Sequence, residues 1–184
     1  MLKIAIIVGS TRPNRKGKGV GDWVFGISKK RTDAEFELVD IAEYNLPLLD
    51  EPVPPSSDNY TKEHTKNWSA KIKSFDGFIF VTPEYNHSTS AALKNGLDFL
   101  YKEWNNKSAG FVSYGFAGGI RAVEQLRPIM ATLQMADVRT QVTLSFQVDF
   151  ENDALKPAAH QEKTLNKLFD EVIAWGTALK TLRK

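Results

Sequence analysis

Short apolar runs alternate with amphipathic segments from one end of this chain to the other. The first run, residues 3–8, is continuous and rich in β-branched residues, which is typical of a strand buried on both faces. Further runs lie at residues 36–41, 77–82, 107–114 and 138–144. Strands that alternate with helices form a parallel sheet with right-handed crossovers. We therefore predict an α/β fold, a three-layer sandwich around a five-stranded parallel sheet in the order 2-1-3-4-5.

The amphipathic segments between these runs predict the helices. One helix is expected at about residues 18–30 and another near 61–75. After the third strand, apolar residues recur at intervals of four, three and four, which predicts one face of a single helix. These residues are Leu93, Leu97, Leu100 and Trp104. The next helix contains Pro128, which predicts a kink or a break in its hydrogen bonding.

Composition narrows the class of protein. The 184 residues, 42% hydrophobic and 25% charged, suit one globular domain spanning 1–184. The net charge of +2 is too small to indicate binding to nucleic acid or to a membrane surface. Cysteine is absent, which excludes thiol catalysis and thiolate metal sites, and the three histidines show no metal-ligand spacing. No apolar run approaches the roughly 20 residues that span a bilayer. The N-terminal run ends too soon for a secretory signal, so a cytoplasmic protein is expected.

The predicted strand order places two loops side by side. In an open α/β sheet, ligands bind at the carboxyl edge where the strand order reverses, here between the first and third strands. The loops that leave these strands span residues 9–17 and 82–90. The second loop displays Pro83-Glu84-Tyr85-Asn86, which offers an aromatic ring and an amide to a flat, hydrogen-bonding ligand.

The first loop has the features of an anion site. Ser10 and Thr11 supply hydroxyls, the following helix start supplies free backbone N–H groups, and Arg12 can add a charge-assisted contact. Glycines at positions 17 and 19 let the backbone approach a ligand closely. The alternative interpretation is a solvated basic turn of the kind found in many α/β proteins.

Spacing rules exclude several phosphate ligands. Asn14 stands where a Walker A loop needs its second glycine, and Gly17-Lys18-Gly19 lies too far from the strand for a dinucleotide fingerprint. Asp40 could serve as the ribose-binding acid of such a fingerprint, but the glycine spacing is wrong. A receiver domain would need an acidic phosphoacceptor where this chain has Thr82-Pro83. A mononucleotide remains, with its phosphate in the first loop and its ring at the second.

Three motifs occur in order along the chain: Gly9-Ser10-Thr11-Arg12, Pro83-Glu84-Tyr85-Asn86 and Leu93-Lys94-Asn95-Gly96-Leu97-Asp98. Together, and at this chain length, they resemble the NADPH-dependent FMN reductases, a flavodoxin-like family that includes small quinone, chromate and azo-dye reductases. The resemblance covers the whole chain. One departure is Pro13-Asn14-Arg15-Lys16, where many members carry a serine-rich segment.

The resemblance implies a function and a site. It implies an NAD(P)H-dependent FMN oxidoreductase that uses NADPH or NADH and reduces quinones or similar small acceptors. The FMN phosphate would be held by Ser10, Thr11, Arg12, Lys18, Gly19 and Val20. The isoalloxazine would be lined by Pro83, Glu84, Tyr85 and Asn86, and Ser113 would contact the edge of the flavin. The family also implies a homodimer or a dimer of dimers, with exposed Phe99, Tyr101 and Trp104 and the proline-rich loop 46–55 as candidate subunit contacts.

The chemistry requires no catalytic side chain, because the cofactor carries the hydride transfer. Glu84 could donate a proton, but an exposed, hydrogen-bonded loop carboxylate is the preferred interpretation. His87 either touches substrate or flavin or is a solvated loop residue. Arg15, Lys16 and Lys18 either attract the extra phosphate of NADPH or form an ordinary basic rim. The main alternative function is a flavodoxin-like electron carrier without a pyridine-nucleotide site, against which the net charge of +2 argues because such carriers are usually acidic.

Overall fold

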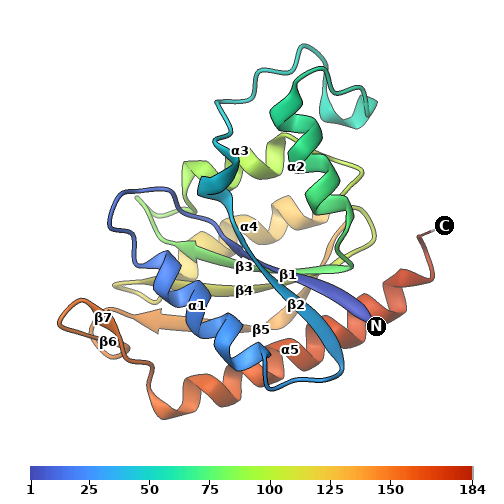
Figure 1. The fold of residues 1–184 in the computed structure, drawn as a ribbon. Helices are drawn as coiled ribbons and strands as arrows, with labels where there is room; N and C mark the ends of the chain where they lie inside the picture. Colours follow the sequence, from blue (N-terminus) through green and yellow to red (C-terminus); the bar gives the residue numbers. More distant parts are fainter. Residues whose placement is uncertain (184) are drawn as a thin grey trace.

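The predicted parallel sheet is present in the computed structural model, which describes residues 1–183 (Figure 1). The strand order is β2-β1-β3-β4-β5, as predicted, and every neighbouring pair is parallel. The register shifts once, between Ala109 and Phe111 of the β4–β5 pair. The strands are β1 (Leu2–Val8), β2 (Ala34–Asp40), β3 (Gly77–Pro83), β4 (Ser108–Gly115) and β5 (Ala136–Ser145).

Helices cover both faces of the sheet and complete the three layers (Figure 1). The helices are α1 (Gly17–Ser28), α2 (Glu63–Lys73), α3 (Ala91–Asp98), α4 (Ile120–Thr132) and α5 (Ala159–Lys180). One core lies between the sheet and α1 and α5, and the other lies between the sheet and α2, α3 and α4. All residues of β3 and β4 are buried, because both faces of these central strands are covered.

Helix α3 is shorter than predicted. It ends at Asp98, and Leu100 and Trp104 follow in a segment of turns. The indole Nε1 of Trp104 donates to the carbonyl of Leu97 (3.2 Å), which thereby satisfies a carbonyl at the helix end. Phe99 and Trp104 are 0% exposed and belong to the core, so the prediction that they form an exposed subunit contact is wrong. Tyr101 is partly buried against the same core.

Pro128 lies inside helix α4, as predicted, and its lack of an N–H removes one hydrogen bond without ending the helix. The segments that follow β2 and β5 contain short elements that the sequence did not predict. The loop between β2 and α2 contains two short 3₁₀ helices, η1 (Ile41–Tyr44) and η2 (Pro55–Ser57). A small antiparallel hairpin of β6 (Phe150–Glu151) and β7 (Ala154–Leu155) follows β5 and was not predicted.

Candidate active site

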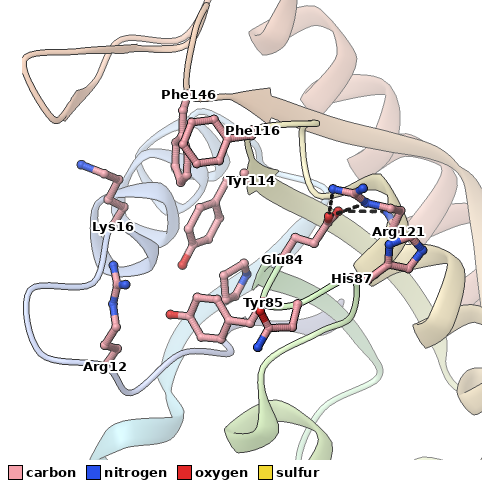
Figure 2. Close-up of a pocket in the computed structure, with 12 residues that line it drawn as sticks. Arg12, Lys16, Glu84, Tyr85, His87, Tyr114, Phe116, Arg121 and Phe146 are labelled. Atoms are coloured by element: carbon pink, nitrogen blue, oxygen red, sulfur yellow. Dashed lines mark hydrogen bonds and ion pairs between the residues drawn. The ribbon is translucent and has the colours of Figure 1, made fainter.

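A cavity of about 370 Å³ opens at the carboxyl edge of the sheet, where the loops after β1, β3 and β4 converge (Figure 2). It lies at the predicted switch point between β1 and β3. We call it the cleft. Its lining residues are Arg12, Lys16, Pro83, Glu84, Tyr85, Asn86, His87, Tyr114, Gly115, Phe116, Arg121 and Phe146.

The second half of the predicted motif folds into a tight hairpin turn. The N–H of Tyr85 donates to the carbonyl of Ser88 (2.9 Å), and the N–H of Ser88 donates back to Tyr85 (3.1 Å). Between them, Asn86 (φ 48°) and His87 (φ 73°) are both left-handed, as a type I′ turn requires. Asparagine and histidine are both among the non-glycine residues that adopt this conformation most often. The turn therefore holds the Asn86 and His87 side chains at the cleft in a fixed backbone frame.

Hydrogen bonds join the loops after β1 and β3. The Ser90 hydroxyl donates to the carbonyl of Gly9 and accepts from the N–H of Leu93 (3.1 Å), so it caps α3 and holds the β1–α1 loop at once. A Cβ at Gly9 would lie 2.9 Å from Leu93 Cδ2 and 3.0 Å from the carbonyl of Val81. Close packing therefore requires glycine at position 9, where the loops after β1 and β3 lie against each other.

Glu84 joins the β3–α3 loop to α4. Its carboxylate accepts from the N–H of Arg121 (3.2 Å) and pairs with the Arg121 guanidinium (Figure 2). The N-cap residue Gly119 offers no side-chain cap, so Glu84 caps α4 from the neighbouring loop. The prediction of a hydrogen-bonded carboxylate was right, but the prediction that it is exposed was wrong. The Glu84 side chain is 6% exposed because α4 begins directly against it.

The β1–α1 loop leaves one cation available to a ligand. Arg12 is exposed and has no carboxylate partner within residues 1–183. Its guanidinium lies 5.8 Å from the centre of the Tyr85 ring. The N-terminus of α1 has no side-chain cap and no acidic residue in its first turn. Free N–H groups and an unopposed guanidinium make this end of the cleft attractive to an anion.

The other basic side chains of this loop and of the first turn of α1 are paired. The ion pairs are Arg15 with Asp40, Lys16 with Asp153 and Lys18 with Asp22. Asp40 also caps η1 by accepting from Ala42 N (3.1 Å), so it serves a structural role here. Because these three cations have partners, the loop offers less free charge than its sequence indicates.

The floor of the cleft is formed by a buried phenol. Burial raises the pKa of Tyr114 to about 12, so its hydroxyl stays protonated at neutral pH. That hydroxyl lies 3.4 Å from Ser10 Oγ, and a Cβ at Gly17 would lie only 2.4 Å from the same Ser10 oxygen. The start of α1 is thus packed tightly on the Ser10–Tyr114 pair.

The structure brings some of the predicted site residues together and not others. Arg12, Pro83, Glu84, Tyr85 and Asn86 line the cleft, and Ser10 lies buried beneath it.

The remaining predicted residues lie outside the lining of the cleft. Thr11 faces a neighbouring cavity of about 500 Å³, and Ser113 is fully buried with its hydroxyl donating to Gly118 O (2.6 Å). Lys18, Gly19 and Val20 lie in the first turn of α1. The Val20 side chain is fully buried and its N–H donates to Lys16 O (3.1 Å), so the N–H groups that precede it in this turn are the ones open to a ligand.

Sequence reasoning missed four residues of the cleft: Tyr114, Phe116, Arg121 and Phe146. Tyr114 and Phe116 flank Gly115 where β4 ends, and Phe146 follows the last residue of β5. Their positions at strand ends were a usable signal, because the carboxyl ends of parallel strands meet at one edge of the sheet.

Phosphate and a flat ring would both fit this cleft. The anion-attracting end holds Arg12 and α1, while the rings of Tyr85, Tyr114 and Phe146 supply flat apolar walls. The volume of about 370 Å³ is within the range of roughly 300–1,000 Å³ found for small-molecule sites. Fold and cleft together define a flavodoxin-like α/β protein of the mononucleotide-binding class.

Comparisons with known proteins identify the family. The family model described as NADPH-dependent FMN reductase matches residues 2–149, and the chain belongs to this family. It is 44% identical over 153 residues to the NAD(P)H-dependent FMN reductase ntnL of a Nectria species, covering 79% of this chain and 76% of that protein. It is 33% identical over 147 residues to an NAD(P)H:quinone oxidoreductase of Solanum tuberosum, covering 73% of this chain and 70% of that protein.

Structural comparison supports the fold assignment. The flavoenzyme NAD(P)H:(acceptor) oxidoreductase FerB of Paracoccus denitrificans superimposes with a TM-score of 0.76 at 20% identity, over 97% of this chain and 98% of that one. Within residues 1–183, no helix is long and apolar enough to cross a membrane. The same residues contain no group of three or more histidine or acidic side chains arranged to hold a metal ion.

Proposed function

We propose that this protein, as a single domain, binds FMN in the cleft and passes electrons from NAD(P)H to quinones or similar small acceptors. The observation that carries the proposal is the pairing of an anion-attracting end with a flat aromatic slot in one cavity. Relatives named as FMN reductases and quinone oxidoreductases support it.

In this proposal the phosphate lies on the β1–α1 loop. Arg12 supplies the charge and the first turn of α1 supplies N–H groups. The hydroxyls of Ser10, beneath the cleft, and of Thr11, in the neighbouring cavity, stand on either side of this position. The ring lies against the β3–α3 loop, where Pro83 to Asn86 offer backbone groups and the Asn86 amide. The Ser113 hydroxyl donates to Gly118 O, so Ser113 would not contact the flavin directly. It would instead hold the loop after β4 in place beside the ring.

Bound FMN would supply the two-electron chemistry that joins a nicotinamide to a quinone. The net reaction is NADPH + H⁺ + quinone → NADP⁺ + hydroquinone, in which the quinone gains two electrons and two protons. Residues of the cleft bind and orient the reactants. Glu84 is engaged with Arg121, and the phenol of Tyr114 keeps its proton at neutral pH, so we assign neither a catalytic proton transfer.

We also propose that the protein forms homodimers or dimers of dimers through the proline-rich loop. Asn95 holds this loop in place, since its amide donates to Pro47 O (2.6 Å) and its carbonyl accepts from Leu49 N (3.0 Å). Between them, Leu48 is 83% exposed. Sedimentation of the wild type and of Leu48→Ser tests this proposal. A cytoplasmic location stays a prediction that cell fractionation can test.

One experiment separates the proposed function from the electron-carrier alternative. Purified protein is loaded with FMN, and its visible spectrum is followed during anaerobic titration with NADPH and, separately, NADH. A reductase loses its yellow colour on addition of the nucleotide. A flavin that dithionite reduces and that neither nucleotide reduces would identify a carrier, and a protein that binds no FMN would refute both.

A further inference from the structure

A run of aromatic rings leads from the floor of the cleft to its mouth. Tyr114 lies 6.3 Å from Phe146, Phe146 lies 5.3 Å from Phe116, and the last two rings meet edge to face at 87°. Phe146 also packs edge to face against Phe150, with ring centres 5.1 Å apart. Phe116 stands at the outer end of this run and is 78% exposed, although a phenyl ring is among the side chains most favoured by burial.

The backbone of Phe116 is held firmly. Its carbonyl accepts from the Ser145 hydroxyl (3.2 Å), and the N–H of Gly118 closes a turn on Gly115 (3.1 Å). Gly118 and Gly119 adopt positive φ angles of 68° and 72°, which turn the chain directly into α4. An exposed ring on such a fixed loop presents a defined flat surface to a ligand at lower entropic cost than a flexible side chain.

The position of this ring separates it from the cofactor half of the cleft. Figure 2 shows Phe116 and Phe146 above Tyr114, on the side opposite Tyr85, with Arg12 farther away toward the β1–α1 loop. In the proposed function FMN lies between Arg12 and the β3–α3 loop. The exposed rim at Phe116 is then left to ligands that enter and leave during each turnover.

We propose that Phe116 is a specificity-determining residue that stacks on planar aromatic electron acceptors of the quinone type. This inference rests on the proposed function. Stacking of two aromatic rings adds about 0.5–1.5 kcal/mol beyond the area that they bury. The exposed Phe116 ring, supported edge to face by Phe146, thus favours flat aromatic acceptors over acceptors without a planar ring.

The test uses the FMN-loaded protein with variants that separate flatness from apolarity. Phe116→Leu keeps an apolar side chain without a ring, and Phe116→Trp keeps a flat one. Val148→Ala is the matched control, because Val148 is a nearby exposed apolar residue (63%) that does not line the cleft. Binding to the oxidised protein is measured by calorimetry with 2-naphthol, a planar molecule without a reducible carbonyl, and with its saturated analogue decahydro-2-naphthol.

The expected result is that Phe116→Leu weakens 2-naphthol binding about fivefold, equivalent to about 1 kcal/mol, and leaves decahydro-2-naphthol unchanged. Phe116→Trp should bind 2-naphthol as the wild type does. In turnover, Phe116→Leu should lower kcat/KM for menadione by a similar factor and leave kcat/KM for ferricyanide unchanged. FMN affinity and thermal stability should match those of Val148→Ala.

Three results would overturn the inference. Equal 2-naphthol affinity in Phe116→Leu and wild type would show that the ring does not stack. An equal fall in kcat/KM for menadione and for ferricyanide would show that Phe116 contributes to FMN binding or to folding and not to acceptor binding. A change in sedimentation without a change in 2-naphthol binding would make it a subunit contact. Failure of the proposed function would appear separately, as a wild type that binds no FMN or that NAD(P)H does not reduce.

Discussion

Removal of the Glu84 carboxylate should loosen two walls of the cleft at once. Glu84 lies on the β3–α3 loop, and its partner Arg121 lies in the first turn of α4. The substitution Glu84→Ala deletes the only side-chain acceptor that the structure shows for the N–H of Arg121 within residues 1–183. It also leaves the Arg121 guanidinium without its carboxylate.

The magnitude follows from the two contacts that are lost. Loss of a helix N-terminal cap costs about 1 kcal/mol. The ion pair adds about 0.2–1 kcal/mol, since the Arg121 side chain is 47% exposed and solvent screens its charge. We therefore expect the free energy of unfolding to fall by about 1–2 kcal/mol. Because FMN binding must then reorder the two loops, its affinity should fall by between about 5-fold and 30-fold.

The assay is urea unfolding of the apoprotein together with titration of FMN by the quenching of flavin fluorescence. Glu84→Gln keeps hydrogen-bond acceptors and loses the charge, so it should lie between Glu84→Ala and the wild type. The matched control is Glu151→Ala, which breaks the exposed Glu151–Lys156 pair and should change neither quantity measurably. If Glu84→Ala behaves like this control in both measurements, the claim that Glu84 ties the loops together is wrong.

Three further predictions concern the first loop, the glycine turn and a buried lysine. Arg12→Ala should weaken FMN binding by about 10-fold to 100-fold, the loss of one charge-assisted contact, and leave riboflavin binding unchanged. An equal loss for both flavins would contradict a phosphate role. Gly119→Ala should destabilise the protein by about 2–5 kcal/mol, because its φ is 72° and its Cβ would lie 2.7 Å from Ser113 Cβ and 2.8 Å from Tyr114 N. Gly26 lies on helix α1, where a Cβ would meet nothing within 4 Å, so Gly26→Ala should stabilise the protein by about 0.5–1 kcal/mol. If urea unfolding gives the same change for both substitutions, the packing argument for Gly119 is wrong. Burial lowers the pKa of Lys107 from 10.5 to about 7 while its amine donates to Ile72 O (3.0 Å) and Lys73 O (3.3 Å). Between pH 7 and pH 10.5, Lys107 therefore holds its proton in the unfolded chain and lacks it in the folded chain. The free energy of unfolding should then rise with pH, by up to about 1.4 kcal/mol per pH unit. Lys107→Met should remove this rise in urea unfolding at pH 7, 8 and 9, and an unchanged slope would show that Lys107 stays charged.

The sheet could be predicted because the amino-acid composition of each strand shows how far the strand is buried. Residues 77–82 form a short run, mostly apolar and without alternation, which is typical of a strand covered on both faces. The predicted strand order in turn puts the β1–α1 and β3–α3 loops next to each other at the carboxyl edge. That step located the cleft and five of its lining residues, Arg12 and Pro83 to Asn86.

The errors arose where distant residues decide local structure. Helix α3 ends at Asp98, and the Trp104 indole folds back to bond Leu97 O, an arrangement that hydrophobic spacing cannot reveal. The sequence could not show which cations of the first loop are free, because Lys16 pairs with Asp153, 137 residues away. Asp153 lies in the turn of the β6–β7 hairpin, whose two-residue strands are too short to be recognised by alternation.

The burial of Glu84 depended on a tertiary contact of the same kind. The motif identifies Glu84 as a loop residue, and loop carboxylates are usually exposed. Its partner Arg121 lies 37 residues further along the chain, at the start of a helix whose N-cap is a glycine. The missing cap on α4 was a signal in the sequence, since a helix that begins without a capping side chain needs an acceptor from elsewhere.

FMN held in the cleft should be open to reduction by NAD(P)H. The decisive measurement is the visible absorbance of the FMN-loaded protein during anaerobic addition of NADPH. We expect the absorbance of oxidised flavin to disappear and a quinone added afterwards to restore it. A yellow protein whose spectrum does not change with excess NADPH or NADH, although dithionite bleaches it, would show that the site is not that of an NAD(P)H-dependent reductase.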